Sequence, residues 1–297
     1  NNLVPESWED RLVKIRPVID HMRKNTLKFK FLIDEMMVPY KGRKAGSLLQ
    51  YLPAKPKKSD FKIFVHAGVS GFLYDFFVYM GKSTVVGATQ IPLKEFGLGT
   101  NVVLHLCKTI RNPPDYVVYF DNFFTSLSLL TYLKDSTGLR SLGTIRKNGL
   151  MGCKLEDDRE LLKRGRGSFN CRVDNDALLA IVKWADNSHL VMPVGEVKRS
   201  SKKKGRQISV PCPQIVEEYN HRLGGVGLAD MLIALYGTPA KSHRWYLCIF
   251  WQLTDIVVNN SWLLYLCDTT AISPVKLKKL KTFRLDVAKG LIYPEKQ

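Results

Sequence analysis

Tyr116-Val-Val-Tyr-Phe-Asp121-Asn-Phe-Phe-Thr-Ser126 is the stretch of this 297-residue chain from which its fold can be deduced. The run from Tyr116 to Phe120 is uninterrupted β-branched or aromatic sequence, which predicts a strand buried on both faces in a helix-covered sheet. Thr125 and Ser126 are suitable N-caps, so a helix should follow. Asp121 then lies where the strand meets a turn. Such an acid can simply end a strand, but a metal-dependent nuclease also holds a ligand there.

The composition indicates a globular protein with a polyanionic partner. Hydrophobic residues make up 45% of the chain, enough for a core, and no apolar run reaches the length of a membrane span. We therefore expect no membrane partner. The formal net charge of +18 favours nucleic acid, because runs of Lys and Arg neutralise phosphates. The cysteines show no CxxC spacing, which is typical of reduced thiols in an intracellular protein.

The segments around the Asp121 strand predict a mixed sheet with helices on its faces. The expected order is β-β-β-α-β-α-β, followed by a β-rich insertion over residues 146–210 and then helices. The predicted strands lie at Phe61–Ala67, Gly71–Tyr79, Ser83–Ala88, Tyr116–Phe120, Leu139–Ile145, Gly167–Val173, Leu178–Trp184 and His189–Met192. The predicted helices lie at Trp8–Lys24, Gly97–Ile110, Leu127–Leu133, Pro213–His221, Leu228–Leu235 and Ser242–Asp268.

Several segments in this order resemble the transposase domain of the piggyBac family. They are Phe31-Leu-Ile-Asp-Glu-Met-Met-Val-Pro-Tyr-Lys-Gly-Arg43, Tyr51-Leu-Pro-Ala-Lys-Pro56, Tyr119–Ser126, Gly143–Asn148, Tyr219–Val226 with Ala229-Asp-Met231, and Arg244-Trp245. The resemblance implies an α/β fold, a ribonuclease H-like mixed sheet interrupted by a β-rich insertion. It also suggests a division into an N-terminal segment 1–60, a core 61–145, an insertion 146–210, a helical core completion 211–268 and a basic tail 269–297.

The resemblance further implies metal-dependent DNA strand cleavage and transfer, in which three carboxylates converge on two divalent ions such as Mg²⁺. Asp121 corresponds to the second acid. The first acid is expected at the end of the strand Phe61–Ala67, where this chain has Ala67 or Gly68. The third falls on Gly227 in Gly224-Gly-Val-Gly227-Leu-Ala-Asp230, with Asp230 matching a further acid three residues on. Two of three acid positions therefore lack a carboxylate.

Other acids offer partial replacements at best. Asp230 shares a helix face with position 227, but it is equally explained as an acid that favours the start of a helix. Asp75 is a candidate relocated ligand, although a solvent-facing strand position is the simpler interpretation. Asp34 and Glu35 lie where the family already has acids, so we do not expect them to compensate. We predict Asp121 and Asp230 as a weak remnant metal site, lost catalysis and no bound cofactor.

The leading interpretation is a catalytically inactive, transposase-derived protein of the nucleus that binds double-stranded DNA; the resemblance also allows a homodimer. The predicted contacts are Lys41, Arg43, Lys55, Lys57, Lys58, Lys198, Arg199, Lys202, Lys203, Lys204, Arg206, Arg244 and Trp245. Two alternatives stay open: an active strand-transfer enzyme with relocated ligands, and an interaction module or transposon fossil with no DNA role. After Cys267 no cysteine follows, whereas the family commonly has a cysteine-rich zinc-binding region there. We therefore expect a fragment of a transposon-derived reading frame.

Overall fold

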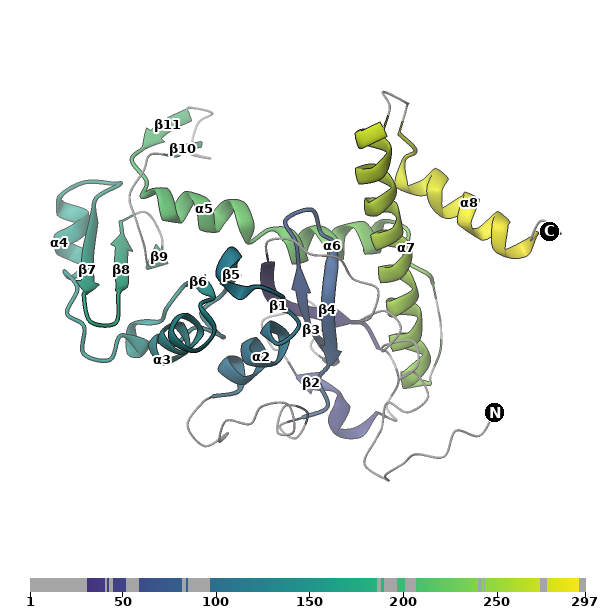
Figure 1. Cartoon of the computed structure of the whole chain (residues 1–297), viewed down its shortest axis with the longest axis horizontal. Coiled ribbons are helices and arrows are strands. Elements are labelled where there is room, and N and C mark those ends of the chain that lie inside the picture. The colour runs from purple at the N-terminus through teal and green to yellow at the C-terminus, as the bar shows by residue number, and fades with distance from the viewer. Residues whose placement is uncertain are drawn as a thin grey trace. The chain divides into compact units, whose positions relative to one another are not determined.

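The computed structural model describes most of the chain and divides it into two compact units (Figure 1). The described residues are 31–40, 42, 45–51, 59–81, 84, 97–185, 188–189, 197–200, 207–239, 242, 244–272 and 277–293. The first unit comprises Asn1–Leu27, Glu35–Gly81 and Gly225–Gln297, and the second Lys28–Asp34 and Lys82–Gly224. The predicted helix Trp8–Lys24 and nearly all of the predicted strand Ser83–Ala88 lie outside the described residues.

A six-stranded mixed sheet contains the predicted Asp121 strand. Its strands are β1 (Phe31–Val38), β2 (Gln50–Tyr51), β3 (Ser59–Ala67), β4 (Leu73–Val78), β5 (Val117–Phe120) and β6 (Arg140–Gly143). Their order is β2-β3-β1-β5-β6, with β4 paired to β3. The pairings β1–β5 and β5–β6 are parallel, whereas β2–β3 and β3–β4 are antiparallel. The predicted sheet is therefore confirmed, but β1 was not among the predicted strands.

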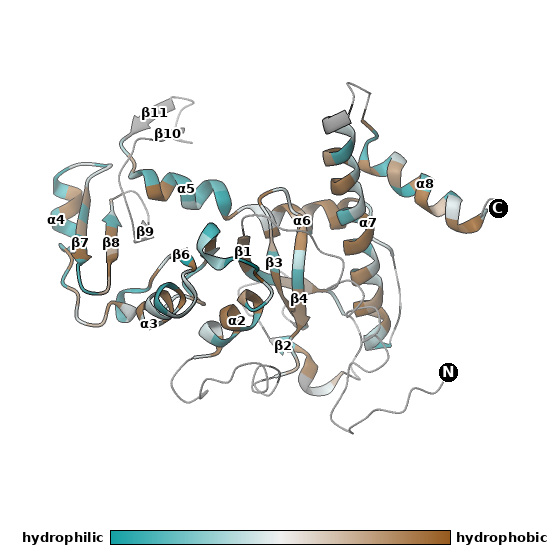
Figure 2. Cartoon of the chain, viewed as in Figure 1, coloured by the Kyte–Doolittle hydropathy of each residue, from teal (hydrophilic) through white to brown (hydrophobic). Residues whose placement is uncertain are grey.

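The first unit packs helices against the β3–β4 hairpin. Its helices are α6 (Gly225–Leu235), α7 (Trp245–Ile272) and α8 (Leu280–Ile292), with a 3-10 turn η1 (Gly46–Leu48). The Asn260 side chain of α7 behaves like a strand neighbour, because its Oδ1 accepts from the Leu73 N–H at 3.1 Å and its Nδ2 donates to the Leu73 carbonyl at 2.8 Å. Figure 2 shows hydrophobic residues along much of α7. The long core helix predicted from Ser242 is thus present, and part of the predicted basic tail forms α8.

The second unit surrounds β5 with short helices. These are α2 (Leu98–Cys107), α3 (Leu127–Tyr132) with its π-helical continuation η4 (Leu133–Thr137), and α5 (Gln214–Arg222), with 3-10 turns η3 (Pro113–Asp115) and η5 (Lys147–Gly149). Val118, Tyr119 and Phe120 are buried, as predicted. The Ser126 hydroxyl accepts from the Leu129 N–H at 3.2 Å, so the predicted N-cap is confirmed.

The β-rich insertion belongs to the second unit and forms two small sheets. The order β7-β8-β9 joins β7 (Phe169–Asp174), β8 (Leu179–Trp184) and β9 (Ser188–His189), while β10 (Val197–Ser200) pairs with β11 (Gln207–Val210). Helix α4 (Asp158–Lys163) precedes them. The Trp184 indole N–H donates to the Pro211 carbonyl at 3.0 Å, which ties β8 to the chain after β11. None of the helices in the described ranges is long and apolar enough to cross a membrane.

Candidate functional site: the acids that follow the β1–β5 pairing

Two aspartates directly follow the paired residues of the neighbouring parallel strands β1 and β5. Residues 31, 32 and 33 of β1 pair with Val118, Tyr119 and Phe120 of β5. The next residue on each strand is an acid, Asp34 on one and Asp121 on the other, and both are partly exposed. Because parallel strands present their carboxyl ends at one edge of a sheet, the register brings these two carboxylates together.

The backbone turn after β5 fixes the orientation of Asp121. One carboxylate oxygen, Oδ1, accepts from the Phe123 N–H at 2.8 Å. The Asp121 carbonyl accepts from the N–H groups of Phe124 and Thr125 at 3.2 Å each and from the Thr125 hydroxyl at 2.7 Å. The turn therefore satisfies its own backbone groups while the carboxylate caps it, as the simpler interpretation of this acid had predicted.

Tyr219 of α5 lies within the electrostatic reach of both acids. Its hydroxyl donates to the Phe120 carbonyl at 3.3 Å, next to Asp121. Burial raises the pKa of Tyr219 to about 12; a hydrogen bond with Thr144 opposes the shift, and the negative charges of Asp121 and Asp34 add to it. A single phenol that senses both carboxylates supports the pairing that the strand register gives.

Ala67 and Gly68, the expected positions of the first acid, carry no carboxylate and belong to the first unit. Ala67 is completely buried at the end of β3, and Gly68 begins the β3–β4 turn, where its N–H donates to the Phe72 carbonyl at 2.8 Å. A Cβ added at Gly68 would lie 3.0 Å from the Tyr74 ring. A side chain at Gly68 would therefore press against the Tyr74 ring.

Sequence reasoning considered Asp34 but did not expect it next to Asp121, because β1 was not recognised as a strand. One signal could have found it: Phe31-Leu-Ile-Asp34 repeats the change from apolar run to acid seen at Tyr119-Phe120-Asp121. The two adjacent acids and the short apolar run obscured the strand, which is stabilised by its neighbours in the sheet rather than by its own alternation of residues.

Asp75 does not face solvent as expected. It is 3% exposed on β4 and pairs across the hairpin with His66, which is 2% exposed. Asp75 Oδ1 accepts from the Phe76 N–H at 2.7 Å. Burial lowers the pKa of His66 to about 4, and the charge of Asp75 offsets this only in part. The pair belongs to the core of the first unit.

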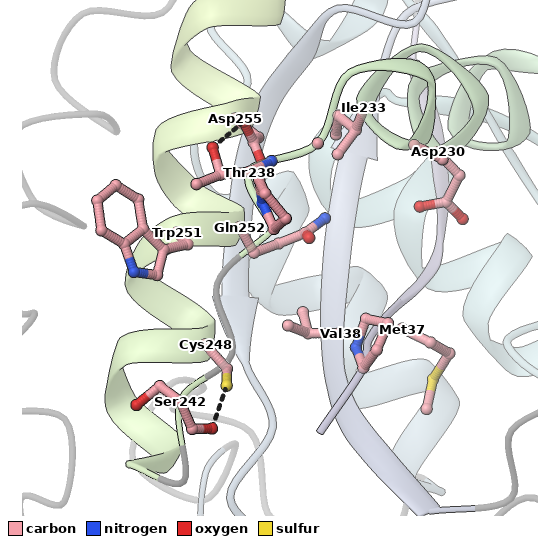
Figure 3. A pocket seen from close by; sticks show the side chains of 14 residues that line it. Met37, Val38, Asp230, Ile233, Thr238, Ser242, Cys248, Trp251, Gln252 and Asp255 are labelled. Carbon is pink, nitrogen blue, oxygen red and sulfur yellow. Dashed lines mark hydrogen bonds between the residues drawn. The ribbon is translucent and has the colours of Figure 1, made fainter. Parts of the chain in front are cut away.

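Gly227 and Asp230 lie on exposed positions of α6. A Cβ added at Gly227 would meet no atom within 4 Å, so nothing in the packing requires a glycine there. Asp230 lines a pocket of about 740 Å³ in the first unit, together with Met37, Ile233 and Trp251 (Figure 3). The other acid of this pocket, Asp255, is occupied by the N–H and hydroxyl of Thr238 and by Arg284. Among the described residues, no three His, Cys, Asp or Glu side chains gather where they could hold a metal ion.

These donors fit a two-ion centre only in part. Asp34 and Asp121 supply neighbouring carboxylate oxygens of the kind that Mg²⁺ prefers. Position 227, where the family motif has its third acid, supplies none. Two carboxylates fall short of the three that the two-ion reaction needs.

Most of the predicted DNA contacts lie outside the described residues, namely Lys41, Arg43, Lys55, Lys57, Lys58, Lys202, Lys203, Lys204 and Arg206. Lys198 and Arg199 are on β10. Arg244 is exposed just before α7. Trp245 is half-buried, with its ring centroid 6.4 Å from that of the core residue Phe61. Packing explains the indole, and its role in DNA contact stays a prediction.

Comparison with known proteins agrees with the motifs and with the fold. A family model described as transposase IS4 matches residues 1–262. The human PiggyBac transposable element-derived protein 3 is 31% identical over 271 residues, which cover 86% of this chain and 44% of that protein. The human PiggyBac transposable element-derived protein 2 is 29% identical with the same coverage. The chain belongs to the piggyBac transposase family.

The fold is that of a piggyBac transposase. A cryo-EM structure of the piggyBac transposase synaptic complex with hairpin DNA matches with a TM-score of 0.71 at 23% identity, over 95% of this chain and 59% of that one. This likeness confirms the predicted ribonuclease H-like α/β fold. The chain spans less than half the length of the two human piggyBac-derived relatives.

Proposed function

We propose that this piggyBac-derived chain binds double-stranded DNA in the nucleus and does not catalyse strand transfer. The observation that carries the binding is the net charge of +18. Fields of that size attract polyanions, and phosphate neutralisation gives sequence-independent affinity that falls steeply with salt. The structural neighbour is a transposase complex that contains hairpin DNA, which is consistent with the same class of ligand.

The loss of catalysis rests on position 227. Gly227 stands where the family motif has an acid, and a metal-binding set whose members act together loses function when one member is absent. The β1–β5 register gives Asp121 one neighbouring carboxylate, that of Asp34, while position 227 has none.

Duplex binding is tested by fluorescence anisotropy over a range of salt concentrations. We expect log K to fall linearly with log salt, with a slope near −0.9 for each neutralised phosphate. Binding that is absent at low salt, or that changes little between low and physiological salt, contradicts the proposal.

Nuclear localisation is tested with a fluorescent fusion, because the Lys- and Arg-rich run 198–206 is a candidate import signal. Exclusion of the fusion from nuclei contradicts that part.

Catalysis is tested by plasmid nicking in Mg²⁺ or Mn²⁺. We expect no nicking by the natural chain. The matched variant is Gly227→Asp, which restores the carboxylate of the family motif at a position where the surrounding space is open. Nicking by the natural chain that disappears in Asp121→Asn contradicts the proposal.

The retained pair of Asp34 and Asp121 favours one alternative, an active enzyme whose third ligand lies elsewhere. The same assay decides between the two readings. Under this alternative, Asp34→Asn abolishes nicking as completely as Asp121→Asn does.

A further inference from the structure

An aromatic side chain stands at the surface directly beside the acid pair. Phe123 is 39% exposed, whereas its neighbour Phe124 is 1% exposed. The two rings meet edge to face at 5.0 Å between centroids. Phe124 thus anchors the turn in the core while Phe123 presents ring surface to solvent, two residues from Asp121.

The turn is held rigidly from the side of α2. A Cβ added at Gly99 would lie 2.2 Å from the Phe123 carbonyl oxygen and 2.9 Å from the Phe124 Cα, so the helix backbone touches the turn directly. The hydroxyls of Thr100 and Ser126 are 3.3 Å apart and close the turn at its other end. The backbone from which the Phe123 ring projects is therefore fixed by the protein's own packing.

A cation reaches the same turn from the segment after β6. A Cβ at Gly143 would lie 2.2 Å from the Thr125 hydroxyl and 2.9 Å from the Phe120 ring, so β6 ends in close contact with the turn. A few residues later, the Nε–H of Arg146 donates to Asn122 Oδ1 at 2.8 Å. Arg146 and Asn122 are both exposed. The structure thereby brings a guanidinium to the turn that carries Phe123 and Asp121.

We propose that Phe123 and Arg146 form a subsite for an unpaired nucleotide, with its base stacked on Phe123 and its phosphate bound by Arg146. This inference rests on the proposed DNA binding and names the form of DNA that this turn selects. Every base has a face that stacks on an aromatic ring, but a duplex hides those faces between its base pairs. The carboxylates of Asp34 and Asp121 repel a phosphate, which leaves Arg146 as the group on this turn that attracts one.

The experiment compares a blunt duplex with the same duplex carrying a short single-stranded overhang that contains 2-aminopurine. Anisotropy reports the affinity, and 2-aminopurine fluorescence reports stacking. For the natural chain we expect tighter binding of the overhang and quenched fluorescence. Phe123→Ala should weaken overhang binding about 5- to 150-fold, the range for one lost base stack, and leave blunt-duplex binding unchanged.

Three further variants separate stacking from charge and from folding. Phe123→Trp should keep both affinity and quenching, whereas Phe123→Leu keeps an apolar side chain and should lose the quenching. Arg146→Gln should weaken binding of the overhang and keep the quenching at saturation. The matched controls are Met151→Ala, which removes an apolar side chain that is 78% exposed, and Arg159→Gln, which removes an exposed cation; neither should change the preference for the overhang.

The outcomes are distinguishable. Blunt-duplex binding without a preference for the overhang, or full quenching in Phe123→Leu, overturns this inference and leaves the proposed function standing. Binding of neither DNA by the natural chain overturns the proposed function, and the subsite with it. Equal losses on both DNAs in Phe123→Ala and Phe123→Trp show that the ring only supports the fold, which also overturns the inference.

Discussion

The turn after β5 and the first turn of α6 carry the two clearest family motifs, yet their surroundings differ. Around Asp121, the turn bonds its own backbone, touches the α2 backbone at Gly99 and receives Arg146 at Asn122. Around Gly227, no atom lies within 4 Å of the place where a Cβ would be. The first motif is therefore required by packing as well as by chemistry. In the second motif position 227 is free of packing demands, so the packing does not require an acid there.

The largest expected effect is a loss of folding stability when the buried ion pair near α6 is broken. It tests whether the first unit is firmly packed around α6 even though position 227 on that helix is open. Asp255 is 4% exposed and binds Thr238, just after α6, and Arg284 of α8. Asp255→Ala leaves Arg284 without its buried partner, which should cost about 3–5 kcal/mol. Urea unfolding measures it. The control is Asp286→Ala. Asp286 lies on α8, as Arg284 does, but its ion pair with Lys278 is exposed, so its loss should change the free energy of unfolding little.

A pH titration tests the core of the first unit at His66. The folded pKa of about 4 is below the ordinary value of 6.5, so the unfolded chain binds the extra proton first. Stability is then lost as pH falls from about 6.5 toward 4, by about 3 kcal/mol in total. His66→Gln should flatten this part of the profile of unfolding free energy against pH. A profile unchanged by the substitution would show that other groups cause the acid sensitivity.

Glycine-to-alanine substitutions test the comparison itself. At Gly99 the added methyl would overlap the Phe123 carbonyl, and we expect a loss of about 1–3 kcal/mol. Thermal unfolding with circular dichroism measures the loss. An unchanged melting temperature would show that the turn after β5 yields easily, and the contrast between the two motifs would weaken.

The smallest expected effect is a gain at Gly227. Glycine loses more backbone entropy on folding than alanine does, and an added Cβ meets no atom at this position. Gly227→Ala should therefore stabilise the first unit by about 0.5–1 kcal/mol. Gly225→Ala is the control on the same helix. Its Cβ would lie 2.1 Å from the Gly68 carbonyl oxygen, so it should destabilise. Destabilisation by both alanines would mean that position 227 is not open.

Local patterns were enough for much of the fold. The β5 strand, its Ser126 cap, the β3–β4 hairpin and the long helix α7 follow from apolar runs, turn residues and capping residues that act over a few positions. The same patterns predicted the order of the elements and the β-rich insertion, with which the family resemblance agrees. Strand β1 escaped because adjacent acids interrupt its apolar pattern, and its pairing partner β5 is far away in sequence.

The sequence by itself determined the family, the net charge of +18, the strand that ends before Asp121 and the absence of an acid at 227, since all of these can be seen in residue types and spacing. Only the tertiary structure decided that Asp34 follows the residues paired with the Asp121 strand, that Asp75 is buried beside His66, and that Arg146 donates to the turn that holds Phe123. The physical reason is that strand register and close backbone contacts join residues distant in the chain. Such contacts leave no local pattern in the sequence.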